Sequence, residues 1–429
     1  MVFIKFTLNQ YKKNLLLLFI FFFTACQKDS DSSLKNDKNV VNQTLSLNVF
    51  DLSSDAFELS LTKESQLAVF DSLFNNPSGY QLPGNPSKST LHAFFDDLRL
   101  GYFKKDEGID YSHIRKEYHT FTHAMDVMIT THALLESGGA VYLSDIERAS
   151  LVLAALGHDV LHTGVNNSFL IETKHPYFLE LGENSLQEKR SARHVLSLMD
   201  KHGILVVAED MDDLQIKEVK EARNLVEQSI LWTDIKRHGE QMKKMEEATE
   251  NILIALKKAR ADTSDIDGEI VGASKEDLQG NVDVNNFIDV ETRILIGSYI
   301  LHCADISNPG KQWANCERWA VLVMNEFFSQ GDLQKKLGFK PSMNCDRATV
   351  SVPACQVGFG KYVIRDLYEL LSKTLHDGGS YFVNHFNVNQ EKWIALEAKA
   401  KNTGSPYTMK FYPPSQEGGW TGKFRVGEE

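Results

Sequence analysis

The sequence predicts an all-α protein, on three observations. Apolar residues recur at spacings of three and four, as Val219, Ala222, Val226 and Ile230 do, which is the stripe of an amphipathic helix. Sustained alternation of apolar and polar residues is sparse, and Asn-Gly hairpin turns do not occur. The 429 residues are 42% hydrophobic and 24% charged, which is ample for a large core. The length fits two or three domains of roughly 150 residues, or one helical domain of about 350.

The N-terminal segment has the pattern of an export signal. Three lysines precede an unbroken apolar run at 15–23, which is shorter than the roughly 20 residues that span a bilayer but typical of a signal-peptide core. The run ends in Phe-Thr-Ala-Cys, which resembles a bacterial lipobox, so we expect residues 1–26 to be a signal peptide and Cys26 to be lipidated. An uncleaved signal anchor is the alternative. The lipobox interpretation implies a protein exported to the bacterial cell envelope and attached to its membrane.

Composition divides the rest of the chain. Residues 27–44 are polar and suit a tether, and the helical pattern occupies 45–400, which we expect to be one domain. Residues 401–429 contain Pro and Gly pairs and should form an irregular tail.

Within the domain, the pattern separates one central helix from two loops. Residues 146–156 are apolar nearly all round, so this helix should be buried. Residues 75–89 are rich in Pro and Gly, and residues 260–286 are polar and acidic, so we expect loops there.

Charge and cysteine content exclude several classes of function. The net charge of −12, which becomes −15 if the signal peptide and its three lysines are removed, argues against a nucleic-acid partner. The five cysteines are scattered without paired spacing, so neither a zinc ribbon nor a disulfide framework is indicated. An anionic substrate would need a local binding site.

Histidines and aspartates gather in apolar surroundings. His119 and His123 are four residues apart and Asp126 follows, so a helix there would place them on one face. We expect His158 and Asp159, with His162 three residues later, to repeat the arrangement inside the most apolar helix of the chain, and Asp305 follows another apolar run. Singly, each is more readily explained as a hydrogen-bonded core residue. Together they indicate a metal centre, since imidazole and carboxylate bind zinc, manganese, iron or magnesium and a carboxylate can bridge two ions.

Three segments carry a resemblance to a known family. Residues 118–127, 158–171 and 304–311 are similar to the signature blocks of class I cyclic nucleotide phosphodiesterases, within the HD phosphohydrolase superfamily. Further matching blocks follow in the same order around Trp319, Glu326-Phe327-Phe328, Cys345-Asp346 and Gln356-Val357-Gly358-Phe359. The resemblance covers roughly 45–400 and implies a compact multi-helix domain with a metal site between helices.

The resemblance implies roles for the clustered residues. It makes four of them the ligands of a tightly held Zn²⁺: His123, His158, Asp159 and Asp305. Asp159 would also reach a second ion, Mg²⁺ or Mn²⁺, and a hydroxide bridging the ions would attack phosphorus in line. His119 would be the general acid, with Glu188 holding its imidazole and His162 contacting metal-bound waters.

The same resemblance implies a site for a purine base. A glutamine amide such as that of Gln356 can pair with adenine or, turned over, with guanine. Phe359 and Val323 would cover the two faces of the base, with Asn308 and Tyr118 beside it.

The sequence departs from the family pattern at three places. Thr163 stands where proline is usual, Lys189-Arg190-Ser191 stand where Asn-His-His is common, and Cys316 replaces a tyrosine that in some members fixes the glutamine. The last departure leaves the choice between cAMP and cGMP open.

We therefore expect a lipid-anchored, metal-dependent phosphodiesterase that converts 3′,5′-cyclic nucleotides to 5′-monophosphates. One alternative is an HD phosphohydrolase acting on another phosphoester, against which the purine-binding block weighs. The other is a non-catalytic cyclic nucleotide sensor in the envelope, which would not need a general acid. The sequence does not indicate the oligomeric state.

Overall fold

The computed structural model describes residues 52–54, 56–57, 62–104, 114–261, 271–410 and 412. All of them belong to one compact unit, Phe50–Glu429. The expected signal peptide, the lipidation site Cys26 and the tether lie outside the described residues. Among the residues that are described, no helix combines the length and the apolar character needed to cross a membrane.

The described residues form helices joined by loops and short turns, so the all-α prediction is confirmed. The α-helices are α3 (Lys63–Phe74), α4 (Lys88–Phe103), α5 (Phe121–Glu136), α6 (Asp145–Gly157), α7 (Asn167–Glu172), α8 (Pro176–Leu181), α9 (Leu186–His202), α10 (Asp213–Leu231), α11 (His238–Ala261), α12 (Lys275–Gln279), α13 (Val290–Asp305), α14 (Trp313–Lys336), α15 (Val352–Phe359), α16 (Arg365–Thr374) and α17 (His376–Thr403). Single turns of 3₁₀-helix cover Gly139–Tyr142, Ile235–Arg237 and Asn308–Gly310, and one π-turn covers Gly360–Ile364. In this part of the chain the only β-type pairing is an isolated bridge between Ala273 and Leu375.

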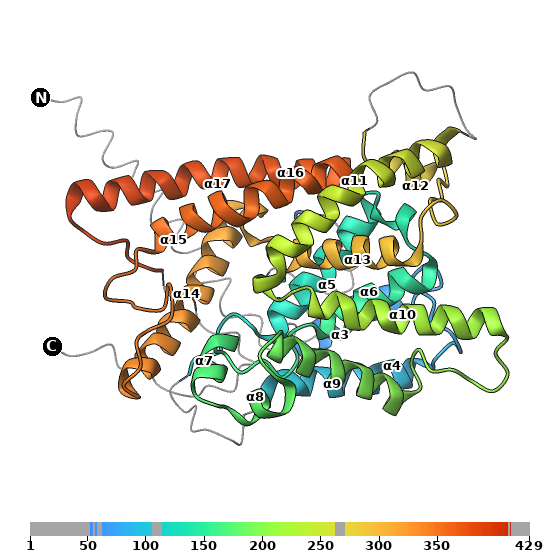
Figure 1. Ribbon diagram of the computed structural model, residues 1–429, viewed down its shortest axis with the longest axis horizontal. Coiled ribbons are helices and arrows are strands. Elements are labelled where there is room, and N and C mark those ends of the chain that lie inside the picture. The colour runs from blue at the N-terminus through green and yellow to red at the C-terminus, as the bar shows by residue number, and fades with distance from the viewer. Residues whose placement is uncertain are drawn as a thin grey trace, which may run out of the picture. The chain divides into compact units, whose positions relative to one another are not determined.

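The centre of the bundle is made by α5, α6 and α13 (Figure 1), with α10 packed across α6 and α13. The predicted stripe of α10 is buried, from Val219 to Ile230, and faces these two helices. Helix α6 is buried along almost its whole length, as its apolar sequence predicts. Helices α16 and α17 pack on each other and α17 also contacts α15. The central helices are therefore fixed by apolar burial on several sides.

Helix starts follow from local capping chemistry. At α6, the Ser144 hydroxyl accepts from the Glu147 backbone N–H while the Glu147 carboxylate accepts from the Ser144 N–H. Asp212 and Gln215 make the same reciprocal pair at α10. Each box satisfies backbone donors that the first helical turn leaves without partners.

The predicted loops are partly confirmed. Residues 75–87 separate α3 from α4, as expected. The expected loop at 260–286 is wrong in one stretch, because α12 lies within it. Ser274 and Asp277 form a capping box there, and Arg260 binds the Asp277 carboxylate at 2.6 and 2.7 Å. The tail expected from residue 401 begins later, because α17 continues to Thr403, and the described residues Gly404–Lys410 are outside regular structure as expected.

A buried ion pair holds the segment that follows α13. The Lys311 ammonium lies 2.5 Å from the Asp126 carboxylate of α5 and 3.3 Å from the Thr130 hydroxyl, and both charged side chains are almost fully buried. From α17, Asn389 donates to the backbone carbonyls of Pro309 and Lys311. Asp126 is thus a structural partner of Lys311.

Removal of this lysine should destabilise the fold strongly. Lys311→Met leaves the Asp126 charge buried without its cation, which costs about 3–5 kcal/mol of the free energy of unfolding. The surface pair Lys401–Glu397 provides the control. Lys401→Met should change the free energy of unfolding by less than about 0.5 kcal/mol. Equal losses in denaturant unfolding of the two variants would contradict this assignment.

Candidate active site

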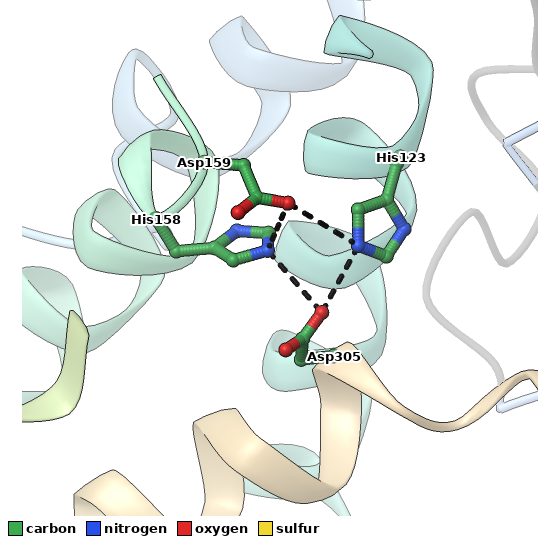
Figure 2. A group of neighbouring side chains, drawn as sticks. All are labelled: His123, His158, Asp159 and Asp305. Carbon is green, nitrogen blue, oxygen red and sulfur yellow. Dashed lines mark hydrogen bonds and ion pairs between the residues drawn. The ribbon is translucent and has the colours of Figure 1, made fainter. Parts of the chain in front are cut away.

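Four side chains converge where three central helices begin or end (Figure 2). The His123 Nε2 atom lies 3.0 Å from Asp305 Oδ1 and 3.8 Å from Asp159 Oδ2. The His158 Nε2 atom lies 3.1 Å from Asp159 Oδ2 and 3.3 Å from Asp305 Oδ1. One potential ligand atom from each residue lies within 4.8 Å of the others. The structure therefore brings together the four residues expected to bind a metal ion.

The ends of the helices place these side chains. His123 lies in the first turn of α5, His158 and Asp159 directly follow α6, and Asp305 is the last residue of α13. The expectation that the His158 group lies inside a helix is wrong: α6 ends at Gly157, and Leu161 has a φ of 66°, which does not continue a helix. The side chains are thus presented by a turn.

The donor set fits a divalent cation. His158 donates from Nδ1 to the Ala155 carbonyl at 2.8 Å, so Nε2 is the ring nitrogen that faces the carboxylates. This Nε2 atom and Asp159 Oδ2 are both buried and, within the part of the chain that the structure describes, contact each other at 3.1 Å without the geometry of a hydrogen bond. Two imidazoles and two carboxylates without a thiolate match the preference of zinc, manganese or magnesium.

Electrostatics bind this group together. Burial lowers the pKa of His158, but the carboxylates of Asp159 and Asp305 outweigh it and raise the pKa well above its usual value. Burial raises the pKa of Asp159 and Asp305, and the neighbouring imidazoles outweigh it and lower both. The carboxylates therefore stay charged and require a positive partner.

His119 is held by Glu326 of α14. The His119 Nδ1 atom lies 2.5 Å from Glu326 Oε1, and Glu326 Oε2 accepts from the backbone N–H groups of Glu117, Tyr118 and His119 at 2.9–3.3 Å. Because these N–H groups are bonded to Glu326, they make no helical hydrogen bonds, and residues 118–120 bend before α5 begins. The expectation that His119 shares a helix with His123 is therefore wrong, since α5 begins at Phe121.

The carboxylate tunes the imidazole. Burial lowers the pKa of His119, but the Glu326 charge outweighs it and raises the pKa to about 9. Burial raises the pKa of Glu326, and His119 brings it down to about 2. The pair is therefore an imidazolium with a carboxylate near neutral pH.

The expected partner of His119 was Glu188, and the structure corrects this. Glu188 lies in the first turn of α9 and accepts from the Asn167 amide at 2.9 and 3.3 Å. Burial, and next the Asp234 charge, raise its pKa to about 7. The sequence signal for Glu326 was an acid inside the apolar run of α14, within a block that the resemblance had matched without giving it a role.

His162 lies against the general-acid candidate. Its ring stacks on that of His119, with centroids 3.8 Å apart and planes inclined by 28°. Burial, and next the charge on His119, lower its pKa to about 3. His162 is therefore a neutral ring at physiological pH.

The residues expected to bind the base come from two regions. The Asn308 amide donates to the Tyr118 hydroxyl at 2.5 Å, beside the His119 segment. Val323 of α14 packs in a hydrophobic cluster with Cys316 and with Val357 of α15. Gln356 and Phe359 lie on α15, both half-buried, and the Gln356 backbone carbonyl accepts from Gln390. Helices α14 and α15 thus bring Val323 close to the Gln356 block.

Comparison with known proteins places the chain in a family. Residues 118–386 match the family model described as 3′5′-cyclic nucleotide phosphodiesterase. The chain is 32% identical over 337 residues to a dual specificity calcium/calmodulin-dependent 3′,5′-cyclic nucleotide phosphodiesterase 1 of Drosophila melanogaster, covering 76% of this chain and 34% of the relative. The human phosphodiesterase 1B is 32% identical over 285 residues, covering 66% and 44%.

The chain thus spans less than half the length of these curated relatives. Among solved structures, the phosphodiesterase domain of the RhoPDE fusion protein from the choanoflagellate Salpingoeca rosetta shares the fold. The TM-score is 0.64 at 21% identity, and the match covers 84% of this chain and 99% of that one. The matched region contains the four-residue cluster, His119 and Glu326, and the chain belongs to the 3′5′-cyclic nucleotide phosphodiesterase family.

Proposed function

We propose that the protein is a metal-dependent phosphodiesterase that hydrolyses 3′,5′-cyclic purine nucleotides to nucleoside 5′-monophosphates. The observation that carries the proposal is the pairing of His119 with Glu326 beside the four-residue donor cluster. A protonated imidazole and a cation-binding group on neighbouring segments are the two components that phosphodiester hydrolysis needs. Family membership supports the same reaction.

His123, His158, Asp159 and Asp305 would hold Zn²⁺, and Asp159 would also face a second ion, Mg²⁺ or Mn²⁺. When bound, such cations polarise phosphoryl oxygens and lower the pKa of water. The protein fixes the positions of these side chains. The Ala155 carbonyl holds the ring of His158, and the ends of α6 and α13 hold Asp159 and Asp305.

His119 would protonate the departing 3′ oxygen. Its Nδ1 atom faces Glu326, so Nε2 is the atom that would deliver the proton. Because Glu326 also binds three backbone N–H groups, the carboxylate cannot follow the ring away from this position. His162, stacked on the face of the His119 ring, limits the tilt of that ring.

Gln356 would pair with the purine, Phe359 and Val323 would enclose its faces, and Asn308 and Tyr118 would line its approach. Cys316 is buried in the cluster beside Val323, and a thiol is too weak a hydrogen-bonding group to fix the glutamine amide. Hydrolysis of both cAMP and cGMP therefore follows from this part of the proposal.

Asp305→Ala should lower the rate of cyclic nucleotide hydrolysis by at least about 100-fold, because it removes an anionic ligand from the cluster. Turnover of cAMP, cGMP and bis(p-nitrophenyl) phosphate by the purified protein with added Mg²⁺ measures it. Asp332→Ala removes an exposed acid of α14 that pairs with Arg347 and should leave the rate unchanged.

An unchanged rate in folded Asp305→Ala would sink the mechanism. Preference for the nitrophenyl ester over both cyclic nucleotides would favour the general phosphohydrolase. Nucleotide binding without turnover by the wild-type protein would favour the sensor.

Glu326→Gln should move the alkaline fall of kcat to lower pH. The Glu326 charge raises the pKa of His119, so wild-type activity is kept below that pKa and lost as the pH rises through it. Without the charge the loss should begin about 1–3 pH units lower. Glu317→Gln, on the same helix but paired with Tyr407 and Lys410, is the matched control. Identical pH profiles for Glu326→Gln and wild type would refute the pairing.

We also propose that the protein is exported and held at the cell envelope by a lipid on Cys26. Mass spectrometry of the protein from bacterial membranes should find Cys26 as the first residue, carrying acyl chains. Cys26→Ser should abolish both the cleavage before residue 26 and the acylation. A mature protein that begins at an unmodified Met1 would refute this proposal.

A further inference from the structure

We propose that Thr163 and Gln187 form a positioning pair that holds the His162 ring against His119. The inference rests on the proposed function, because it adds two residues to the machinery that orients the general acid. Neither residue touches the four-residue cluster in the contacts described above. Both act through His162.

The Gln187 side chain is buried and its amide has partners at both ends. Its Oε1 atom accepts from the Thr163 backbone N–H at 3.0 Å and from the Thr163 hydroxyl at 2.7 Å. Its Nε2 atom donates to the Val165 carbonyl at 2.8 Å and lies 3.1 Å from His162 Nε2. A backbone N–H can only donate and a carbonyl can only accept, so these partners fix which way the amide points.

The backbone of Gln187 is fixed as well. Its N–H donates to the Asn167 side-chain oxygen at 3.2 Å, which ties the start of α9 to the start of α7. On the other edge of the imidazole, the Gly164 N–H lies 3.1 Å from His162 Nδ1. Both neighbours are donors and a neutral imidazole accepts at one nitrogen only, so we assign the hydrogen bond to the Gln187 amide and His162 Nε2, with the ring proton on Nδ1.

Holding His162 also holds His119. The two rings stack at 3.8 Å, so a rotation of His162 would open space beside the general-acid candidate. Glu326 fixes His119 in the plane of its ring, and His162 covers its face. Together these contacts leave His119 one orientation.

Thr163 makes this arrangement possible. It supplies two donors to Gln187, and a proline at this position, as the family pattern has, could supply neither. The replacement of proline by Thr163 is thus accompanied by a buried amide, Gln187, which accepts both hydrogen bonds from Thr163. In this chain hydrogen bonds to Gln187 restrain the turn after His162, where a proline ring would restrain φ.

The kinetic test uses three variants. Gln187→Leu removes the amide and should lower kcat about tenfold with KM changed by less than about twofold, as for supporting groups at metal-assisted sites. Thr163→Val keeps the backbone N–H but loses the hydroxyl and should cost less, about threefold, while Thr163→Ser keeps both donors and should match wild type. The double variant Thr163→Val/Gln187→Leu should equal Gln187→Leu, because the two residues act as one unit.

A spectroscopic test is independent of turnover. In protein labelled with ¹³C at histidine Cε1, the His162 signal, assigned by its loss in His162→Gln, should shift in Gln187→Leu and remain in place in Thr163→Ser. If wild-type protein hydrolyses no cyclic nucleotide, the proposed function fails and this signal still decides whether the pair holds His162.

An unchanged kcat and an unchanged His162 signal in Gln187→Leu would overturn the inference. A fall in kcat/KM that comes entirely from a higher KM would also overturn the inference. So would additive losses of kcat in the double variant, since either result indicates a merely structural role. If Gln187→Leu does not fold, Thr163→Val carries the same comparison with its backbone contacts intact.

Discussion

The clustering of two carboxylates and two imidazoles is the constraint on which the rest of the structure depends. Asp159 and Asp305 lie largely buried beside His123 and His158, where the ends of α5, α6 and α13 meet. Charges withdrawn from water are costly unless a partner of opposite sign is close. A bound cation would provide that partner, so the packing of the central helices decides where the proposed metal ligands meet. The helices must end where the ligands are needed.

Buried ion pairs around the cluster also neutralise charges that are withdrawn from water. The Glu326 carboxylate balances His119 and also binds the backbone of residues 117–119 before α5, and Lys311 balances Asp126 of α5. Each pair joins segments that are far apart in sequence. The net charge of −12 would repel a cyclic phosphate at long range, so attraction has to come from cations and imidazolium at the site itself. The proposed cations, together with the His119 imidazolium, would make the site locally positive and so reconcile the overall acidity with the proposed anionic substrate.

Sequence reasoning reached the features that are local or periodic. The stripe of α10 and the apolar circumference of α6 follow from spacing, and the four-residue cluster follows from residue type together with the family resemblance. The partner of His119 was missed because Glu326 is 207 residues away, and its one local signal, an acid in an apolar run, does not say which residue it binds. Helix ends were missed because they depend on single backbone angles, as at Leu161, and on caps such as Ser274 with Asp277. The role of Gln187 emerges only when Thr163 is seen beside it.

The central claim is that a cation joins the four side chains, and anomalous X-ray diffraction from crystals of the purified protein tests it most directly. Data collected on both sides of the zinc absorption edge should show one strong peak about 2.0–2.2 Å from His123 Nε2, His158 Nε2 and one oxygen each of Asp159 and Asp305. No anomalous peak at this position, in protein grown and crystallised with zinc and magnesium present, would contradict the account.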